Sequence, residues 1–339
     1  MKLEVKSPWN LELLEEIPLH SEKEIESICQ KAYETSLLKG LDFPISERIK
    51  VLESFSKSIR KDKENLAKLA STEGGKPLID SIVEIERGAE GVDSTIEVLK
   101  SEAGSVIPMN LNKASSNRLA FTQKEPIGLV LVISAFNHPF NLIIHQLIPA
   151  IASGCSVMVK PAEDTPLSCI QIIKILKESG LPSNRCFFVM PENLELASKI
   201  VSDKRIDFLS FIGSSKVGWM LRSKLSSGTR CALEHGGMAP SFLTESTNID
   251  LACKLLTKGG FYHSGQVCVS VQKIFVHQTI IKEFLDKFES NVKKLKIGDP
   301  ISKNSDMGPL IRPSEVDRVE NWVNEAKHNG CEVIIGGNK

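Results

Sequence analysis

The feature of this sequence that most constrains its fold is a long stretch without charge. From Pro126 to Val159 the chain contains no Asp, Glu, Lys or Arg. An apolar run of this length is long enough to cross a membrane as a helix. Polar side chains and prolines interrupt it, however, and a bilayer span tolerates such interruptions poorly. The stretch therefore predicts buried strands and a buried helix in a globular domain, with no membrane partner. The interruptions are Asn137, His138, Pro139, Asn141, His145, Gln146 and Pro149.

Short apolar runs alternate with helical segments along the middle of the chain. The helical segments span 141–151 and 166–179. Such alternation is typical of βαβ units in an α/β fold, where helices cover both faces of a parallel sheet. Ligands of these sheets bind beyond the carboxyl ends of the strands, so we expect functional residues directly after the apolar runs. The predicted strands are 129–133, 156–159, 186–190 and 208–212.

The remaining segments extend this α/β organisation in both directions. Residues 21–100 are predicted to be helical, mainly 22–38 and 45–71, and to begin at a capping pattern of Ser21 and Glu24. From about His235 the alternation starts again, which indicates a second α/β domain. Its predicted strands are 240–244, 270–277 and 331–335, its predicted helices are 249–260 and 279–294, and an exposed strand is predicted earlier at 117–125.

Composition excludes several kinds of partner. The 339 residues fit two domains, and Lys plus Arg equals Asp plus Glu at 42 each. A chain without net charge has no overall field that attracts nucleic acid. The eight cysteines are scattered without a C-x-x-C pair, which argues against a zinc site or a disulfide framework and favours a reducing, cytoplasmic location. The first residues, Met1 to Leu19, lack the apolar core of a signal peptide.

Two motifs follow the first two predicted strands. In SAFNHP, which starts at Ser134, the Asn137 amide can donate to an oxyanion, or the residue is only a turn former beside Pro139. In KPAE, Lys160 and Glu163 can bind the two hydroxyls of a ribose, or they form an ordinary surface ion pair. A carboxylate in that place repels a 2′-phosphate, which favours NAD over NADP.

Three more segments carry candidate chemistry. FIGSSKVG at 211–218 combines a strand, a glycine-led turn and a helix start, where amides bind phosphate well, although it is not a P-loop and is alternatively a plain tight turn. Cys268, in GQVC, is a candidate thiolate nucleophile or a buried structural cysteine. Glu234, in EHGG, is a candidate base or a loop cap.

The order of these segments resembles the aldehyde dehydrogenase superfamily. AFN, KPAE, FIGS, EHGG and GQVC each have a counterpart there at similar spacing, as does MGPLI from Met307, and the similarity runs from about Ser7 to Gly337. The resemblance implies a Rossmann-type NAD(P)-binding domain at 1–234 and part of a catalytic α/β domain at 235–339. It also implies a homo-oligomer, either a dimer or a tetramer, with the strand near 117–125 in an oligomerisation arm, and no metal.

The resemblance gives each motif a role. Cys268 attacks the aldehyde carbonyl, Asn137 and the Cys268 amide hold the oxyanion, and hydride leaves for the nicotinamide. Glu234 then activates the water that hydrolyses the thioester. Because CoA-acylating relatives commonly lack this glutamate, Glu234 favours a free acid as product. The implied cofactor-binding residues are Ile133, Ser134, Ala135, Phe136, Lys160, Ala162, Glu163, Gly213, Ser214 and Val217.

Three positions depart from the family pattern. Ile212 stands where Thr is frequent, His138 where an apolar aromatic residue is frequent, and His235 where Leu is usual. The FNHPFN variant is closest to the branch that handles lactaldehyde, glyceraldehyde 3-phosphate and phosphonoacetaldehyde, which implies a small, polar or anionic aldehyde. Family members continue well beyond the last residue, Lys339, so we expect this sequence to be a fragment.

Three alternatives remain open. A CoA-acylating semialdehyde dehydrogenase fits the same motifs, although Glu234 disfavours it. A non-catalytic binding or scaffold protein, or an inactive fragment, is allowed by the fold alone. A cysteine hydrolase would use His263, five residues before Cys268, as its base, but the sequence offers no partner to orient that histidine.

Overall fold

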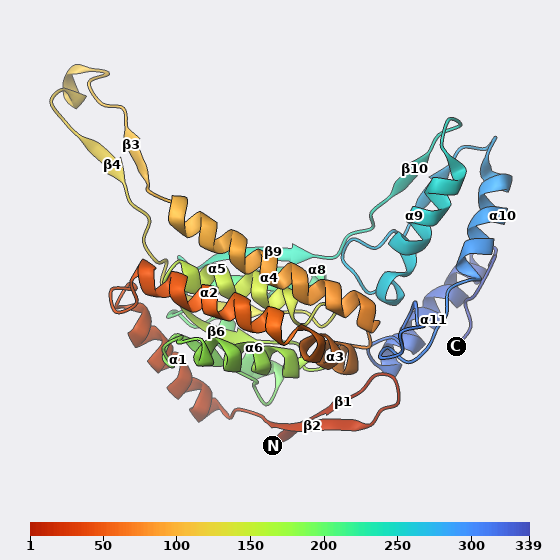
Figure 1. Ribbon diagram of the computed structural model, residues 1–339, viewed down its shortest axis with the longest axis horizontal. Helices are drawn as coiled ribbons and strands as arrows, with labels where there is room; N and C mark the ends of the chain where they lie inside the picture. Colours follow the sequence, from red (N-terminus) through yellow and green to blue (C-terminus); the bar gives the residue numbers. More distant parts are fainter.

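The computed structural model describes residues 1–339, and its centre is a five-stranded sheet with the order β7-β6-β5-β8-β9 (Figure 1). Each strand pairs in parallel with its neighbour, which confirms the predicted βαβ organisation. The first four strands begin where the apolar runs begin, because parallel strands covered on both faces are continuously apolar. The strands are β5 (Leu129–Ile133), β6 (Ser156–Lys160), β7 (Cys186–Phe188), β8 (Phe208–Gly213) and β9 (Arg230–His235).

Side chains alternate between the two faces of this sheet, and each face has its own core. Val130 and Val132 belong to a core of 31 buried residues beneath five helices. Leu129 and Leu131 belong to a core of 14 beneath three others. The first set of helices is α2 (Ile45–Lys61), α3 (Lys63–Gly74), α4 (Leu78–Ser101), α5 (Asn141–Ala152) and α6 (Pro166–Glu178), and the second is α1 (Glu22–Ser36), α7 (Leu194–Val201) and α8 (Ser215–Arg222).

The region before the sheet follows the predictions with two corrections. Glu24 accepts a hydrogen bond from the Ser21 amide at 2.8 Å, which confirms the capping pattern of α1. The helix predicted at 45–71 is interrupted at Asp62, whose φ of −101° and ψ of 17° are not helical. The strand predicted at 117–125 is shorter. It forms the β4 half of an arm that projects from the sheet (Figure 1), whose parts are β3 (Ser105–Ile107), η1 (Lys113–Ser115) and β4 (Ala120–Thr122).

The chain after β9 forms a smaller α/β unit, in which two short parallel strands pack against helices around four buried residues. The strand predicted at 331–335 is absent, because no neighbouring strand pairs with its backbone. No helix of the molecule has both the length and the apolar composition to cross a bilayer. The elements are β10 (Ser241–Leu243), α9 (Ile249–Phe261), η2 (Tyr262–Gly265), β11 (Ile274–Val276), α10 (Ile281–Val292) and α11 (Pro313–His328), and an unpredicted hairpin of β1 (Lys2–Lys6) and β2 (Leu13–Pro18) opens the chain.

Candidate active site

The segments that follow β5 and β6 lie side by side at the carboxyl edge of the sheet. Ile133 pairs with Lys160 in the ladder, and the Ser134 amide donates to the Lys160 carbonyl at 3.0 Å. Ser134 is buried, whereas Ala135 and Phe136 are half-buried. The sheet topology therefore brings the first two predicted motifs together, as expected for a ligand-binding edge.

Lys160 and Glu163 form an ion pair across this edge. Their Nζ and Oε1 atoms are 3.2 Å apart, with 13% of the lysine side chain and 49% of the glutamate side chain exposed. Ala162, between them, is half-buried. The pair thus offers one donor group and one acceptor group at the sheet edge, and each can bond a hydroxyl of a ribose.

Three helices begin at this edge, and only one has a free amino terminus. Glu84 accepts hydrogen bonds at 2.9 Å from two amides at the start of α5, and Glu73 accepts two at 2.8 Å at the start of α6. The start of α8 is exposed, and there the Ser214 hydroxyl accepts from the Val217 amide at 3.4 Å, after the turn at Gly213. Because helix starts bind anions, a cofactor phosphate fits α8, whereas carboxylates already fill the other two.

A buried ion pair fixes the loop that carries Asn137, which we call the oxyanion loop (residues 134–140). Glu84 is 2% exposed, and its carboxylate pairs with Lys76, which is fully buried. The amides that Glu84 binds lie three and four residues after Asn137. The Asn137 side-chain oxygen is buried without a partner, and its nitrogen makes no hydrogen bond within the protein. Asn137 therefore has free N–H groups that can donate to an oxyanion.

Cys268 ends a segment with an unusual backbone, which we call the nucleophile loop (residues 262–268). His263, Ser264 and Gly265 have φ angles of 48°, 56° and 77°. Consecutive left-handed residues store strain, and strained residues cluster at functional sites. Cys268 itself is exposed, so it is not the buried structural cysteine of the alternative interpretation. The buried cysteines are Cys29, Cys155, Cys169, Cys186 and Cys253.

Two contacts bring the nucleophile loop to the ends of β9 and β5. The Gly237 amide, three residues after Glu234, donates to the Cys268 carbonyl at 2.9 Å. The His138 ring stacks on Tyr262 with centroids 5.9 Å apart, and its Nε2 lies 3.4 Å from the Tyr262 hydroxyl. The nucleophile loop therefore contacts both the strand end that carries Glu234 and the oxyanion loop.

The MGPLI segment, which starts at Met307, forms hydrogen bonds with the nucleophile loop, and the sequence alone did not reveal these contacts. The Ser264 hydroxyl donates to the Gly308 carbonyl at 2.7 Å, and the Ile311 amide donates to the Gln266 side chain at 2.9 Å. A Cβ on Gly308 would lie 1.8 Å from the Gly75 carbonyl oxygen, so only glycine fits there. The segment thus joins the nucleophile loop to the junction of α3 and α4.

Two histidines near the site do not act as its base. His235 faces α8, where its ring lies 5.4 Å from that of Trp219, and so points to the opposite sheet face from Glu234. His263 is fully buried, burial lowers its pKa, and neither ring nitrogen has a hydrogen-bond partner. A cysteine hydrolase needs a base bonded to Cys268, and His263 makes no such bond.

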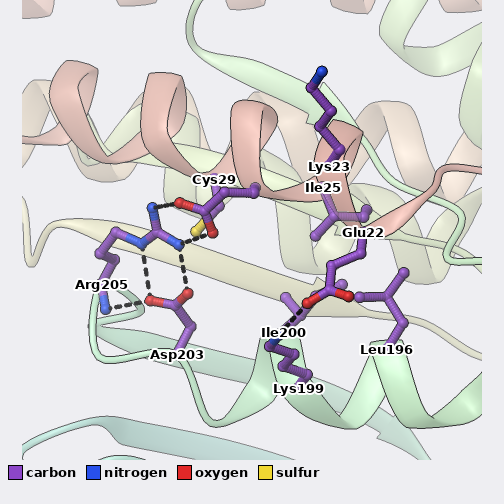
Figure 2. Close-up of a pocket in the computed structure, with 10 residues that line it drawn as sticks. Glu22, Lys23, Ile25, Cys29, Leu196, Lys199, Ile200, Asp203 and Arg205 are labelled. Atoms are coloured by element: carbon purple, nitrogen blue, oxygen red, sulfur yellow. Dashed lines mark hydrogen bonds and ion pairs between the residues drawn. The ribbon is translucent and has the colours of Figure 1, made fainter.

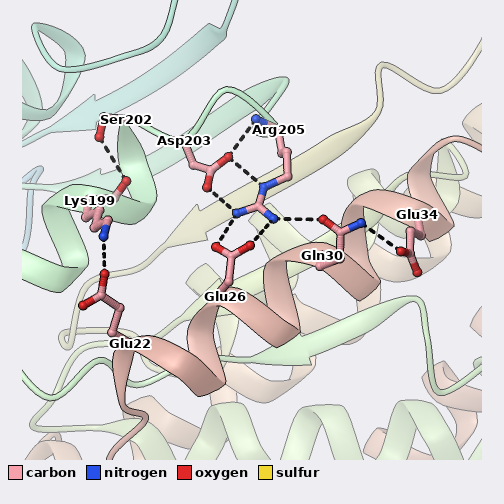
Figure 3. Close-up of polar contacts among 8 residues, drawn as sticks. All are labelled: Glu22, Glu26, Gln30, Glu34, Lys199, Ser202, Asp203 and Arg205. Atoms are coloured by element: carbon pink, nitrogen blue, oxygen red, sulfur yellow. Dashed lines mark hydrogen bonds and ion pairs between the residues drawn. The ribbon is translucent and has the colours of Figure 1, made fainter.

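A separate cavity of about 410 Å³ lies between α1 and α7 (Figure 2). Its charged groups neutralise one another, since Arg205 pairs with both Asp203 and Glu26 (Figure 3). Burial raises the pKa of Cys29 to about 12, so this thiol stays protonated. The cavity contains none of the predicted site residues, and it joins two helices on the second face of the sheet. No group of three or more His, Cys, Asp or Glu side chains in the molecule is placed to hold a metal ion.

A free helix start and a lysine–glutamate ion pair at a parallel sheet edge, beside an exposed cysteine and a free amide, have the features of a dinucleotide-dependent enzyme that works through a thiol. The model of the aldehyde dehydrogenase family matches residues 1–339. The chain therefore belongs to the aldehyde dehydrogenase family and is an NAD(P)-dependent oxidoreductase.

Three relatives illustrate this membership. The 3-sulfolactaldehyde dehydrogenase of Priestia aryabhattai is 33% identical over 339 residues, which are 100% of this chain and 70% of that protein. The lactaldehyde dehydrogenase of Methanocaldococcus jannaschii is 33% identical over 342 residues, 99% of this chain and 72% of that one. The structure of glyceraldehyde-3-phosphate dehydrogenase from the same organism, complexed with NADP, has a TM-score of 0.94 and 32% identity, covering 99% of this chain and 73% of that chain.

Proposed function

We propose that this chain oxidises a small polar aldehyde to the free carboxylic acid, with Cys268 as nucleophile. The observation that carries the proposal is that a loop with an exposed cysteine contacts both the oxyanion loop and the end of β9. The thiolate adds to the carbonyl carbon, while the Asn137 amide and the Cys268 N–H hold the oxyanion. A bound nicotinamide supplies the hydride acceptor. Glu234 then takes a proton from the water that releases the acid and frees the thiol.

The same proposal gives the cofactor its contacts. The open start of α8 holds the phosphates, and Lys160 with Glu163 holds the adenosine ribose. Because the Glu163 carboxylate repels a 2′-phosphate, we infer a preference for NAD over NADP. The ratio of kcat/KM with NAD to kcat/KM with NADP tests this preference. We expect this ratio to fall in Glu163→Gln, because the variant no longer repels the 2′-phosphate of NADP. The other proposed contacts are Gly213, Ser214 and Val217 at the phosphates, Ala162 beside the ribose, and Ile133, Ser134, Ala135 and Phe136 along the cleft.

We also propose that the arm of β3 and β4 joins copies of this chain into a dimer or tetramer. Val106 and Phe121 on the arm are 74% and 68% exposed, and exposed apolar side chains of this kind mark surfaces that contact another protein chain. Phe121→Ser is expected to lower the molar mass that light scattering measures. We further propose that the chain divides into a cofactor-binding part, 1–234, and a catalytic part, 235–339. Because its cysteines are free thiols, we also propose a cytoplasmic location.

Product analysis tests the hydrolytic assignment. With glyceraldehyde and NAD, and without CoA, the chain is expected to form glyceric acid and NADH in equal amounts. Glu234→Gln is expected to slow the release of acid more than the first turnover of NADH. An acyl product that appears only when CoA is added would replace this proposal with the CoA-acylating alternative.

A further inference from the structure

The backbone amides of the oxyanion loop are held by hydrogen bonds only at the two ends of the loop. The first of them, that of Ser134, donates to the last carbonyl of β6 at 3.0 Å. The next amides that donate within the protein are those of Phe140 and Asn141, and both donate to Glu84. The amides between these two points donate to no group of the protein. The position of Asn137 therefore depends on the anchor that Glu84 provides.

Each oxygen of the Glu84 carboxylate has its own partner. Oε1 accepts from both amides at the start of α5 at 2.9 Å, and Oε2 pairs with the ammonium group of Lys76. The glutamate is 2% exposed and the lysine is fully buried. A buried carboxylate is costly unless a cation and hydrogen bonds offset the cost, so Lys76 allows a charged acceptor to lie at this helix start. Charged acceptors hold amides more firmly than neutral ones.

Apolar packing holds the same end of the loop in a different way. Phe140 is fully buried, and a Cβ on Gly88, one turn after Glu84 on α4, would lie 3.1 Å from the Phe140 ring. The ring therefore keeps α5 against α4, whereas Glu84 holds the backbone that leads into α5. Loss of the Glu84 bonds would leave α5 in place and free the backbone of the oxyanion loop.

The first turn of α4 also supports the nucleophile loop. The Leu78 amide donates to the Pro300 carbonyl at 2.8 Å, and Gly308 packs against the turn between α3 and α4. Gly308 in turn accepts the hydrogen bond from the Ser264 hydroxyl of the nucleophile loop. Leu78 and Glu84 are six residues apart, or about 9 Å along the helix. One rigid element therefore meets the supports of both loops.

We propose that Glu84 is a positioning residue for the reaction, because it sets the place where the Asn137 amide meets the oxyanion that forms at Cys268. α4 then keeps the donor and the nucleophile in register. A donor that moves by about 1 Å loses most of its effect, since a hydrogen bond weakens steeply with distance and angle. The inference rests on the proposed function, because it concerns the oxyanion of the same reaction.

Two matched variants separate the hydrogen bonds of Glu84 from its charge. Both carry Lys76→Met, so that no buried charge is left unpaired. Glu84→Gln keeps an oxygen that accepts from the amides, whereas Glu84→Leu has a similar volume and no acceptor. With glyceraldehyde, kcat is expected to be roughly 30- to 100-fold lower with Glu84→Leu than with Glu84→Gln, and the KM for NAD equal within about twofold. The control is Glu90→Leu, at an exposed position of α4, which should keep the wild-type kcat.

A double-mutant cycle separates positioning from a general loss of stability. Asn137→Ala is added to each of the two chains. It is expected to lower kcat about 10²- to 10³-fold beside Glu84→Gln, but less than about tenfold beside Glu84→Leu, where the amide is already out of place. A role in stability alone would leave the cost of Asn137→Ala the same in both chains. That result, or equal kcat in the two parent chains, would overturn the proposal.

Hydrogen exchange tests the anchor without any turnover. Amides in the peptide that spans 134–142 should exchange at least about tenfold faster with Glu84→Leu than with Glu84→Gln, both beside Lys76→Met. The peptide at the start of α6, where Glu73 holds the first amides, should exchange equally in both. Equal exchange at 134–142 overturns the proposal whatever the activity. If the exchange differs but the wild-type chain oxidises no aldehyde, the proposed function fails and the Glu84 anchor stands.

Discussion

Residues 1–235 contain hydrophobic cores of 31 and 14 buried residues, whereas residues 236–339 contain one core of four. The first part therefore holds its sheet edge in place through apolar burial on both faces. The second part, which carries Cys268, is held to the first by polar contacts such as the bond from the Leu78 amide to the Pro300 carbonyl at 2.8 Å. The difference teaches that apolar packing sets the sheet edge that carries Lys160 and Glu163, whereas hydrogen bonds between loops set the position of Cys268.

The largest expected effect is a loss of activity in a variant of the second part, residues 236–339. Cys268→Ser is expected to lower kcat by at least about 10⁴-fold, because a hydroxyl without a paired base is a poor nucleophile. NADH absorbance measures the loss. Cys331→Ser, at the other exposed cysteine, is the matched control and should keep the wild-type rate. Full activity in Cys268→Ser would remove the central assignment.

Two phenylalanines compare the packing of the two parts directly. Phe55 is fully buried in the 31-residue core, and Phe284 is 3% exposed in the four-residue core. Phe55→Ala is expected to lower the free energy of unfolding by about 3–5 kcal/mol. Phe284→Ala is expected to cost about 3 kcal/mol, the lower end of that range because its core is small, and to act only on the second part. Hydrogen exchange in urea measures both, and uniform loss of protection along the chain in both variants would mean that the parts unfold together.

A variant of Asn137 tests the corresponding contribution of the first part, residues 1–235, to the rate of reaction. Asn137→Ala removes the free amide but leaves the contacts of Glu84 that fix the loop, so kcat is expected to fall about 10²- to 10³-fold. The KM for NAD should change little, since the packed edge is intact. Asn65→Ala, at an exposed asparagine of α3, is the control. An unaltered kcat in Asn137→Ala would exclude the amide from the oxyanion site.

The smallest expected effect is a pH dependence of the free energy of unfolding, and it comes from Glu73 in the first part of the chain. Burial raises the pKa of Glu73 from 4.5 to about 7, although hydrogen bonds from the start of α6 oppose the shift. A carboxyl that binds its proton more tightly in the folded state favours folding below pH 4.5, and this contribution is lost as pH rises through about 7. The loss amounts to at most about 3 kcal/mol.

Glu73→Gln isolates this contribution. Relative to the wild type, the variant should gain unfolding free energy on going from about pH 5 to about pH 8, because it has no proton to lose. Urea unfolding at the two pH values measures the gain. Glu64→Gln, at an exposed position of the same helix, should show none. A constant difference between Glu73→Gln and the wild type would contradict the raised pKa.

The strands of the sheet, and the order of the motifs that follow them, could be predicted because each depends on a short stretch of sequence. A parallel strand buried on both faces is a continuous apolar run, so the starts at Leu129, Ser156, Cys186 and Phe208 were visible in the sequence. The motifs after those runs lie at one edge because parallel strands end together. The capping pair at the start of α1 is local in the same sense.

The features that could not be predicted depend on contacts between distant segments. Glu73 and Glu84 look like any other acid on an amphipathic helix until α5 and α6 place their first amides against them. The run at 331–335 has the composition of a strand but finds no partner.

The claim on which the account depends is that the carbonyl carbon of the substrate becomes bonded to Cys268. Glu234→Gln, mixed with glyceraldehyde and NAD and quenched in acid, should retain the acyl group because its hydrolysis is slowed. Peptide mass spectrometry is predicted to find the glyceryl mass on the peptide that contains Cys268 and on no other cysteine. An acyl group on a different residue, or NADH formation without any covalent acyl group, would contradict the account.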